Sequence, residues 1–170
     1  MRHILAVLVE NNPGVLTRVA GLFSRRGYNI DSLTVGRTEN QNISRMTIVV
    51  EGDDLVLEQV TKQLHKLIDV IKINDITSEQ YVDRELVLVK VGADAAVRGE
   101  IMQIVDIFRA RIVDIGQRTL IIECTGDEGK INAVIESLKS FGIKELVRTG
   151  KIAMLRGQKF TSLNETREDD

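Results

Sequence analysis

Two features of this 170-residue sequence predict an α+β fold built from two tandem βαββαβ units. Short stretches of alternating or continuous apolar residues mark strands, and longer stretches between them repeat apolar residues at helical spacing. The order strand, helix, strand, strand, helix, strand occurs over residues 1–77 and again over residues 85–160. Each unit is therefore expected to be a ferredoxin-like sheet with its helices on one face.

The first unit opens with an apolar strand and an amphipathic helix. A strand is predicted over residues 1–9, and its residues 4–9 are apolar on both faces, which is typical of a central strand that is covered on both sides. Gly27 is expected to end the helix, because glycine readily adopts the left-handed conformation that closes many helices. The helix stripe that we expect to be buried consists of Val15, Leu16, Val19, Leu22 and Phe23.

A hairpin, a second helix and a fourth strand complete the first unit. Strands over residues 29–38 and 44–51 are predicted to pair as the hairpin, because a polar turn separates them. Asp53 or Asp54 is expected to cap the second helix. The closing strand is predicted over residues 69–76.

A polar stretch at residues 78–84 is interpreted as a linker, and the second unit repeats the pattern after it. Asp94 is expected to cap the first helix of that unit. The final residues 161–170 are polar and acid-rich, so they are predicted to form a disordered tail. The other elements of the second unit are predicted as strands over residues 85–91, 111–115, 119–125, 143–148 and 151–156 and a helix over residues 127–140.

The first strand and the first helix meet at the turn Asn12-Pro13-Gly14. Asn12 is a favourable helix N-cap, Pro13 suits the first helical position, and Gly14 lets a ligand approach the backbone closely. Free N–H groups at a helix start can hold a carboxylate or a phosphate. An ordinary capped helix explains the same residues, and the turn alone does not decide between these interpretations.

Composition excludes several classes of protein. No apolar run reaches the roughly twenty residues of a membrane span, and the N-terminus lacks the pattern of a signal peptide, so we expect a cytoplasmic protein without membrane contact. The net charge of −2 and the pI near 5.8 argue against a nucleic-acid-binding protein. The single cysteine leaves no disulfide framework.

The sequence contains no recognisable catalytic or metal-binding motif. His3 and His65 lack further ligands at metal-binding spacing, and Cys124 occupies an apolar position that predicts a buried side chain. Neither a catalytic triad nor a phosphate-binding loop can be identified. We therefore expect neither catalysis nor a bound cofactor in this chain alone.

Several sequence runs resemble a known family. The runs are VLVENNPGVLTRVAGLF, RGYNIDSLTV and LEQVTKQLHKL in the first unit and IFRARIVDI in the second. They resemble the regulatory small subunit of acetohydroxyacid synthase, also called acetolactate synthase. The resemblance implies that the first unit is an ACT domain and that the chain makes no product itself. It further implies activation of a catalytic large subunit, which carries thiamine diphosphate, magnesium and FAD, and feedback inhibition by valine, leucine or isoleucine, with valine as the leading candidate.

The resemblance also indicates where this amino acid binds, since in the family it lies between two protomers. We expect the Gly14 and Val15 amides to receive its carboxylate, Asn11 and Asn29 to supply hydrogen bonds, and Ile30 to line an apolar pocket. A purely structural interpretation remains open, in which Asn11 only tightens the turn and Asn29 only follows the end of the helix.

A ferredoxin-like sheet leaves an open edge, and two such units commonly pair edge to edge, so we expect a homodimer with two equivalent sites. The second unit lacks the Asn-Pro-Gly turn and is assigned to dimer support and to contact with the catalytic subunit. A free-standing amino-acid sensor, or a regulator of a different biosynthetic enzyme, stays an alternative. An RNA-binding domain is not retained as an alternative, because such a domain stacks bases on aromatic side chains and aromatic residues make up only 4% of this sequence.

Overall fold

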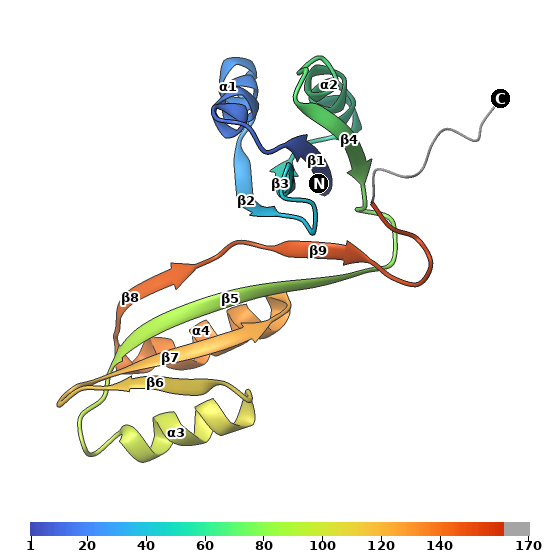
Figure 1. Cartoon of the computed structure of the whole chain (residues 1–170). Coiled ribbons are helices and arrows are strands. Elements are labelled where there is room, and N and C mark those ends of the chain that lie inside the picture. The colour runs from blue at the N-terminus through green and yellow to red at the C-terminus, as the bar shows by residue number, and fades with distance from the viewer. Residues whose placement is uncertain (162–170) are drawn as a thin grey trace. The chain divides into compact units, whose positions relative to one another are not determined.

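The computed structural model describes residues 1–161, and its contacts divide the chain into two compact units (Figure 1). The first unit combines Met1–Val82 with the segment that begins at Lys151, and the second unit is Asp83–Gly150. Apart from Thr161, the predicted tail lies outside the described residues. Within the described part of the chain, no helix is long and apolar enough to cross a membrane.

The first unit is a four-stranded antiparallel sheet with two helices on one face (Figure 1). The strand order β2-β3-β1-β4 makes β1 and β3 central and β2 an edge strand. Val7 of β1 lies opposite Met46 of β3 and Ile73 of β4. The elements are β1 (Arg2–Glu10), α1 (Val15–Arg26), β2 (Ile30–Arg37), β3 (Ile43–Glu51), α2 (Asp54–Leu64) and β4 (Val70–Asp75).

Both faces of β1 are buried, as its apolar sequence predicts. Leu5 and Val7 belong to the cluster under the helices, which includes Phe23 of α1. Ile4 and Ala6 belong to a second cluster on the opposite face of the sheet, and that cluster is completed by Ala153 from the far end of the chain. The two-sided apolar pattern of β1 therefore needs partners from both ends of the sequence.

The strand predicted over residues 151–156 is present as β9 (Ile152–Leu155), but its segment groups with the first unit. Strand β9 pairs with β5 (Tyr81–Gly92), which begins inside the stretch that the sequence marks as a linker. The backbone N–H of Arg156 donates to the Gln80 carbonyl oxygen at 2.8 Å. The sequence predicts β5 only from residue 85, because the polar residues around Tyr81 hide its beginning, and its partner β9 lies some seventy positions away.

The second unit repeats the architecture with the strand order β6-β7-β5-β8 and two helices. Val89 of β5 lies opposite Ile122 of β7 and Leu146 of β8. Cys124 is buried in this core, as predicted, and burial raises the pKa of its thiol. The remaining elements are α3 (Arg98–Ile107), β6 (Arg111–Ile115), β7 (Thr119–Gly126), α4 (Glu128–Leu138), a short 3-10 helix (Lys139–Phe141) and β8 (Ile143–Arg148).

The helix ends confirm two local predictions and correct two others. Gly27 ends α1 in the left-handed conformation, and Asp53 caps α2 by accepting the Val56 N–H. Asp94 does not cap α3 with its side chain, because Val97 occupies the N-cap position of that helix. Leu16, predicted to be buried, is 46% exposed, so the buried stripe of α1 is narrower than its apolar residues suggest.

Candidate functional site

The turn after β1 differs in geometry from the capped helix that its sequence predicts. Gly14, not Asn12, occupies the N-cap position of α1, and its φ of +84° is left-handed. Asn12 instead turns back, and its Nδ2 donates to the Glu10 carboxylate at 2.8 Å. Pro13 precedes the helix rather than opening it. The motif therefore builds a bend that requires glycine, because a side chain at such a φ is strained.

This bend leaves backbone N–H groups available at the start of α1. The Val15 N–H makes a long hydrogen bond of 3.4 Å to the Asn12 carbonyl oxygen. The N–H groups of Gly14, Leu16 and Thr17 have no acceptor among the described residues. Free N–H groups at the positive end of a helix attract anions. The Gly14 amide is thus free for a ligand, whereas the Val15 amide is partly engaged.

A guanidinium group that the sequence analysis did not single out lies beside the bend. The Arg18 Nε donates to Asp69 Oδ2 at 2.6 Å, and the Asp69 side chain is only 8% exposed. This hydrogen bond, together with the Asp69 charge, raises the pKa of the Arg18 guanidinium although desolvation opposes the shift. A Cβ added to Gly14 would lie 2.9 Å from Arg18 Nη1. Arg18 therefore places a fixed positive charge over the glycine.

Only part of this arrangement could be found from the sequence. Arg18 follows Gly14 by four positions, so a helix beginning at the turn puts both on one face. Asp69 comes 51 positions after Arg18, immediately before β4, and its role depends on the pairing of β4 with β1. No local pattern signals that contact.

Asn11 is held by the hairpin between β2 and β3. Its backbone N–H donates to the Asn42 carbonyl oxygen at 2.7 Å, and its side-chain Nδ2 donates to the Gln41 carbonyl oxygen at 2.9 Å. Its Oδ1 accepts a hydrogen bond of 3.2 Å from the Ser44 hydroxyl. These contacts support the interpretation that Asn11 tightens the turn. A carboxamide has two N–H groups and two acceptor lone pairs, so one of each still remains for a ligand.

Asn29 and Ile30 lie at the other end of the sheet. Ile30 is opposite Val50 of β3, whereas Asn11 contacts Ser44 of the same strand. The distance from residue 44 to residue 50 along a strand is about 20 Å. One protomer therefore does not bring the two halves of the expected site together. Asn29 is exposed, and Ile30 is half-buried against the cluster under the helices.

The described residues offer no alternative centre for metal chemistry. Residues 1–161 contain no group of three or more His, Cys, Asp or Glu side chains that could hold a metal ion. His3 is buried with neither ring nitrogen hydrogen-bonded, and Cys124 lies in the core of the second unit. At the bend at Gly14, by contrast, free N–H groups lie beside a positively charged side chain.

Two family models match separate parts of this chain. A model described as an acetohydroxyacid synthase (AHAS) small subunit-like ACT domain matches residues 5–72. A model described as the small subunit of acetolactate synthase matches residues 84–157. Together the two matches account for most of the described residues.

Individual proteins agree with the family models. A protein of Archaeoglobus fulgidus, named a probable acetolactate synthase small subunit, is 62% identical over 159 residues, which cover 94% of this chain and 99% of the relative. The acetolactate synthase small subunit of Aquifex aeolicus is 54% identical over 156 residues, 91% of this chain and 81% of the relative. The crystal structure of the acetolactate synthase small subunit from Thermotoga maritima is 43% identical, covers 94% of this chain and 99% of that chain, and superimposes with a TM-score of 0.86.

Proposed function

This chain belongs to the small subunits of acetolactate synthase, and we propose that it activates the catalytic large subunit and confers feedback inhibition by a branched-chain amino acid, most readily valine. Its first unit is the ACT domain of that family. The observation that carries the proposal is the bend at Gly14, where free N–H groups lie beside the Arg18 guanidinium.

A free amino acid needs a receptor for its carboxylate, an acceptor for its ammonium group and an apolar pocket. The Gly14 amide and the Arg18 guanidinium meet the first need, because both are hydrogen-bond donors, the guanidinium is positively charged, and the amide lies at the positive end of the helix dipole. The Asn11 side chain has a remaining lone pair that suits an ammonium group. Ile30, half-buried at the start of β2, supplies branched apolar surface.

Pairing of two protomers explains how residues about 20 Å apart in one chain serve one ligand. β2 is an edge strand that begins at Ile30 and ends at Arg37, and Asn11 lies near the Arg37 end. Two β2 strands that pair antiparallel about a two-fold axis bring the start of one strand to the end of the other. On this proposal Gly14 and Asn11 of one protomer face Asn29 and Ile30 of its partner.

The chemistry itself is assigned to the large subunit, which on this proposal carries thiamine diphosphate, magnesium and FAD and shares the cytoplasm with this chain. An effector that binds across the seam of a dimer favours one arrangement of the two protomers. A coupling of roughly 1–3 kcal/mol between effector binding and the catalytic subunit is enough for strong regulation. The second unit is proposed to support the dimer and to contact the large subunit.

The proposal is tested by titrating the full chain with valine, leucine and isoleucine in a calorimeter, in parallel with acetolactate assays of the reconstituted subunit pair. We expect saturable binding of at least one of these amino acids, stimulation of the catalytic subunit by this chain, and loss of that stimulation on effector binding. Binding without any effect on the catalytic subunit would instead favour a free-standing sensor. Failure of all three amino acids to bind would contradict the assigned effector.

A further inference from the structure

The face of the first sheet that points away from the helices is crossed by residues 151–161, named here the C-terminal strap. The strap is fastened to the sheet by side chains of β2 and β3. The Lys151 N–H donates to the Ser32 hydroxyl oxygen at 3.0 Å, and the Thr34 hydroxyl donates to the Lys151 carbonyl oxygen at 2.5 Å. The Arg45 Nη2 donates to the Ala153 carbonyl oxygen at 2.7 Å.

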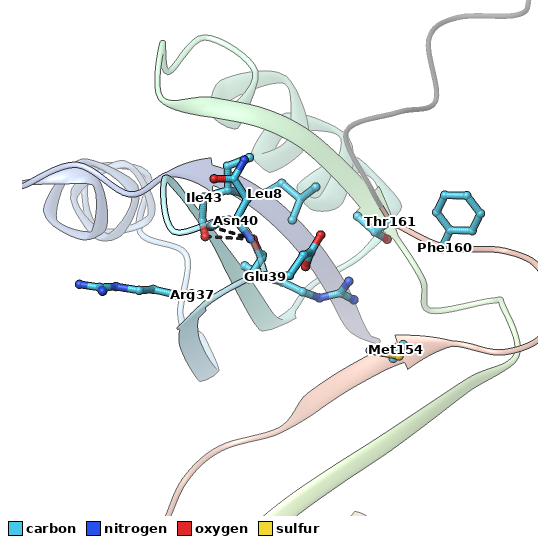
Figure 2. A pocket seen from close by; sticks show the side chains of 10 residues that line it. Leu8, Arg37, Glu39, Asn40, Ile43, Met154, Phe160 and Thr161 are labelled. Atoms are coloured by element: carbon cyan, nitrogen blue, oxygen red, sulfur yellow. Dashed lines mark hydrogen bonds between the residues drawn. The ribbon is translucent and has the colours of Figure 1, made fainter.

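A cavity of about 340 Å³ opens between this strap and the hairpin of β2 and β3 (Figure 2). Its inner wall is apolar, since it includes the buried side chains of Leu8 and Ile43. Met154 and Phe160 of the strap also line it, and they are 66% and 54% exposed. Large apolar side chains that line a cavity and keep most of their surface in water gain free energy when a ligand covers them.

The cation of this cavity is Arg45, which lies on β3 directly opposite Leu8 of β1. Arg45 is half-buried, and no carboxylate of residues 1–161 lies within ion-pairing distance of it. Desolvation accordingly lowers the pKa of its guanidinium. A partly desolvated guanidinium with a carbonyl as its partner keeps several N–H groups for an anion. Beside it on β2 stands Gly36, where an added Cβ would meet nothing within 4 Å, so the space next to the cation is open.

The other charged groups of the cavity restrict what it can accept. Figure 2 shows the Arg37 side chain extending away from Leu8 and Met154, so Arg37 adds little to the interior. Glu39 stands at the hairpin and is exposed. One internal cation with a carboxylate nearby suits a ligand with a single negative charge.

We propose that this cavity binds a small monocarboxylic acid with an apolar body, with the carboxylate on Arg45 and the body between Leu8, Ile43 and the strap. The cavity is large enough for a ligand of this size, since ligand pockets begin at about 300 Å³. Such a ligand bridges the strap and the hairpin, so it holds the strap onto the sheet.

The hairpin also connects this cavity to the bend at Gly14. Thr38 and Asn40 line the cavity, and the next residues of the same turn, Gln41 and Asn42, accept the hydrogen bonds of Asn11. A ligand in the cavity therefore restrains the support of Asn11. The acid-binding site itself does not rest on the proposed regulatory function.

The test is an NMR titration of the full chain, observing backbone amides and the Met154 methyl group, with hexanoate as the probe. Three further probes dissect the ligand: hexanol keeps the body without the charge, adipate adds a second carboxylate, and inorganic phosphate is an anion without a body. We expect hexanoate to shift the resonances of Met154, Asn40 and Asn11, and to bind about tenfold more tightly than each of the other three.

Substitutions distinguish specific binding at Arg45 from a general effect of positive charge on hexanoate affinity. Arg45→Gln is expected to weaken hexanoate binding by about tenfold. Arg37→Gln removes the same charge from the rim and is expected to change the affinity by less than about twofold. Phe160→Ala removes an exposed side chain, so the fold survives, and it is expected to weaken binding by about threefold.

Equal hexanoate affinity in folded Arg45→Gln, or hexanol or phosphate binding as tightly as hexanoate, overturns the proposal. If Arg45→Gln does not fold, Phe160→Ala and the four probes decide the matter by themselves. Hexanoate binding by an unsubstituted chain that binds none of valine, leucine and isoleucine leaves this site intact and contradicts only the proposed effector. A chain that binds valine but not hexanoate contradicts the acid-binding site and leaves the proposed effector site standing.

Discussion

The two units of this chain share one fold but close the turn after their first strand in different ways. In both units the residue that follows the strand donates its N–H to the neighbouring hairpin, Asn11 to Asn42 at 2.7 Å and Ala93 to Arg118 at 2.9 Å. This backbone hydrogen bond is a feature of the shared fold. It recurs although the two turns share no sequence motif.

The side chains around the two turns differ. In the second unit the Arg98 guanidinium spans the turn, with Nε donating to the Ala93 carbonyl oxygen at 2.9 Å and Nη2 to the Gln117 carbonyl oxygen at 2.7 Å. In the first unit Arg18 pairs sideways with Asp69 and leaves the N–H groups of the bend free. The βαββαβ fold thus supplies a helix start twice, and the arginine beside each start makes different contacts, to backbone carbonyl oxygens in the second unit and to a carboxylate in the first.

The largest effect is expected from Gly14→Asp, which should abolish valine binding. Its side chain meets Arg18, and its charge repels the ligand carboxylate. The left-handed φ of +84° adds a backbone cost of roughly 1–2 kcal/mol. Calorimetry of the full chain should show a loss of affinity of about a hundredfold or more.

Two controls accompany Gly14→Asp. Gly21→Asp puts the same charge on the same helix, where an added Cβ meets nothing within 4 Å, and should leave valine binding intact. Leu22→Ala removes a core side chain, which should cost roughly 2–5 kcal/mol of stability and reduce activation and inhibition together. Valine inhibition that survives Gly14→Asp would move the effector site elsewhere.

Asn29→Ala is expected to have the next largest effect. It removes one polar contact to the ligand, worth roughly 1–3 kcal/mol when the partner group stays buried, or about five- to 150-fold in affinity. Asn29 is exposed and outside the core clusters, so activation of the catalytic subunit should survive. Parallel assays of activation and valine inhibition measure both effects, and a joint loss of the two would mark Asn29 as structural.

Arg98→Gln tests the corresponding turn in the second unit. The substitution removes a charged donor from backbone carbonyl oxygens, which should lower the free energy of unfolding by roughly 1–3 kcal/mol. Urea unfolding measures this change. Because the proposed effector site lies in the first unit, valine affinity should stay within about twofold of the unsubstituted chain. A large loss of valine affinity would show that the second turn contributes to the site.

The smallest effect is expected for the chemical labelling of Cys124. Burial of the thiol should keep it unreactive toward iodoacetamide until the second unit opens, and valine should not change the labelling rate. Since burial raises the pKa of the thiol, the unfolded thiol ionises first as the pH rises above about 8.5. The free energy of unfolding should therefore fall as the pH rises from that value toward the folded pKa. Rapid labelling at neutral pH would contradict the rigid core of the second unit.

The sequence predicts those parts of the fold that local patterns encode. The element order, the hairpin of residues 111–125 and the helix cap Asp53 follow from periodicity and from a short polar side chain that accepts a nearby N–H group. Asn12 and Asp94 carry the same local signal, yet neither side chain caps a helix. At Asn12 the left-handed Gly14 shifts the start of the helix by two positions.

Contacts between distant segments could not be predicted. Asp69 reaches Arg18 only after β4 has paired with β1, and Ala153 covers Ile4 only after the chain has completed the second unit and returned. Neither contact leaves a periodic or spacing signal in one sequence. The expected site residues therefore lacked Arg18, the one charged side chain that lies over Gly14 in the described unit.

Subunit mixing tests the central claim most directly, namely that Gly14 of one protomer and Asn29 of its partner face the same amino acid. In a dimer of one Gly14→Asp chain and one Asn29→Ala chain, one site carries both substitutions and the other carries neither. Calorimetric titration with valine should recover one site of unsubstituted affinity per mixed dimer, although neither parent variant shows any. If the mixed dimer shows no such site, the two residues serve the same protomer's ligand or none, and the account of the effector site is wrong.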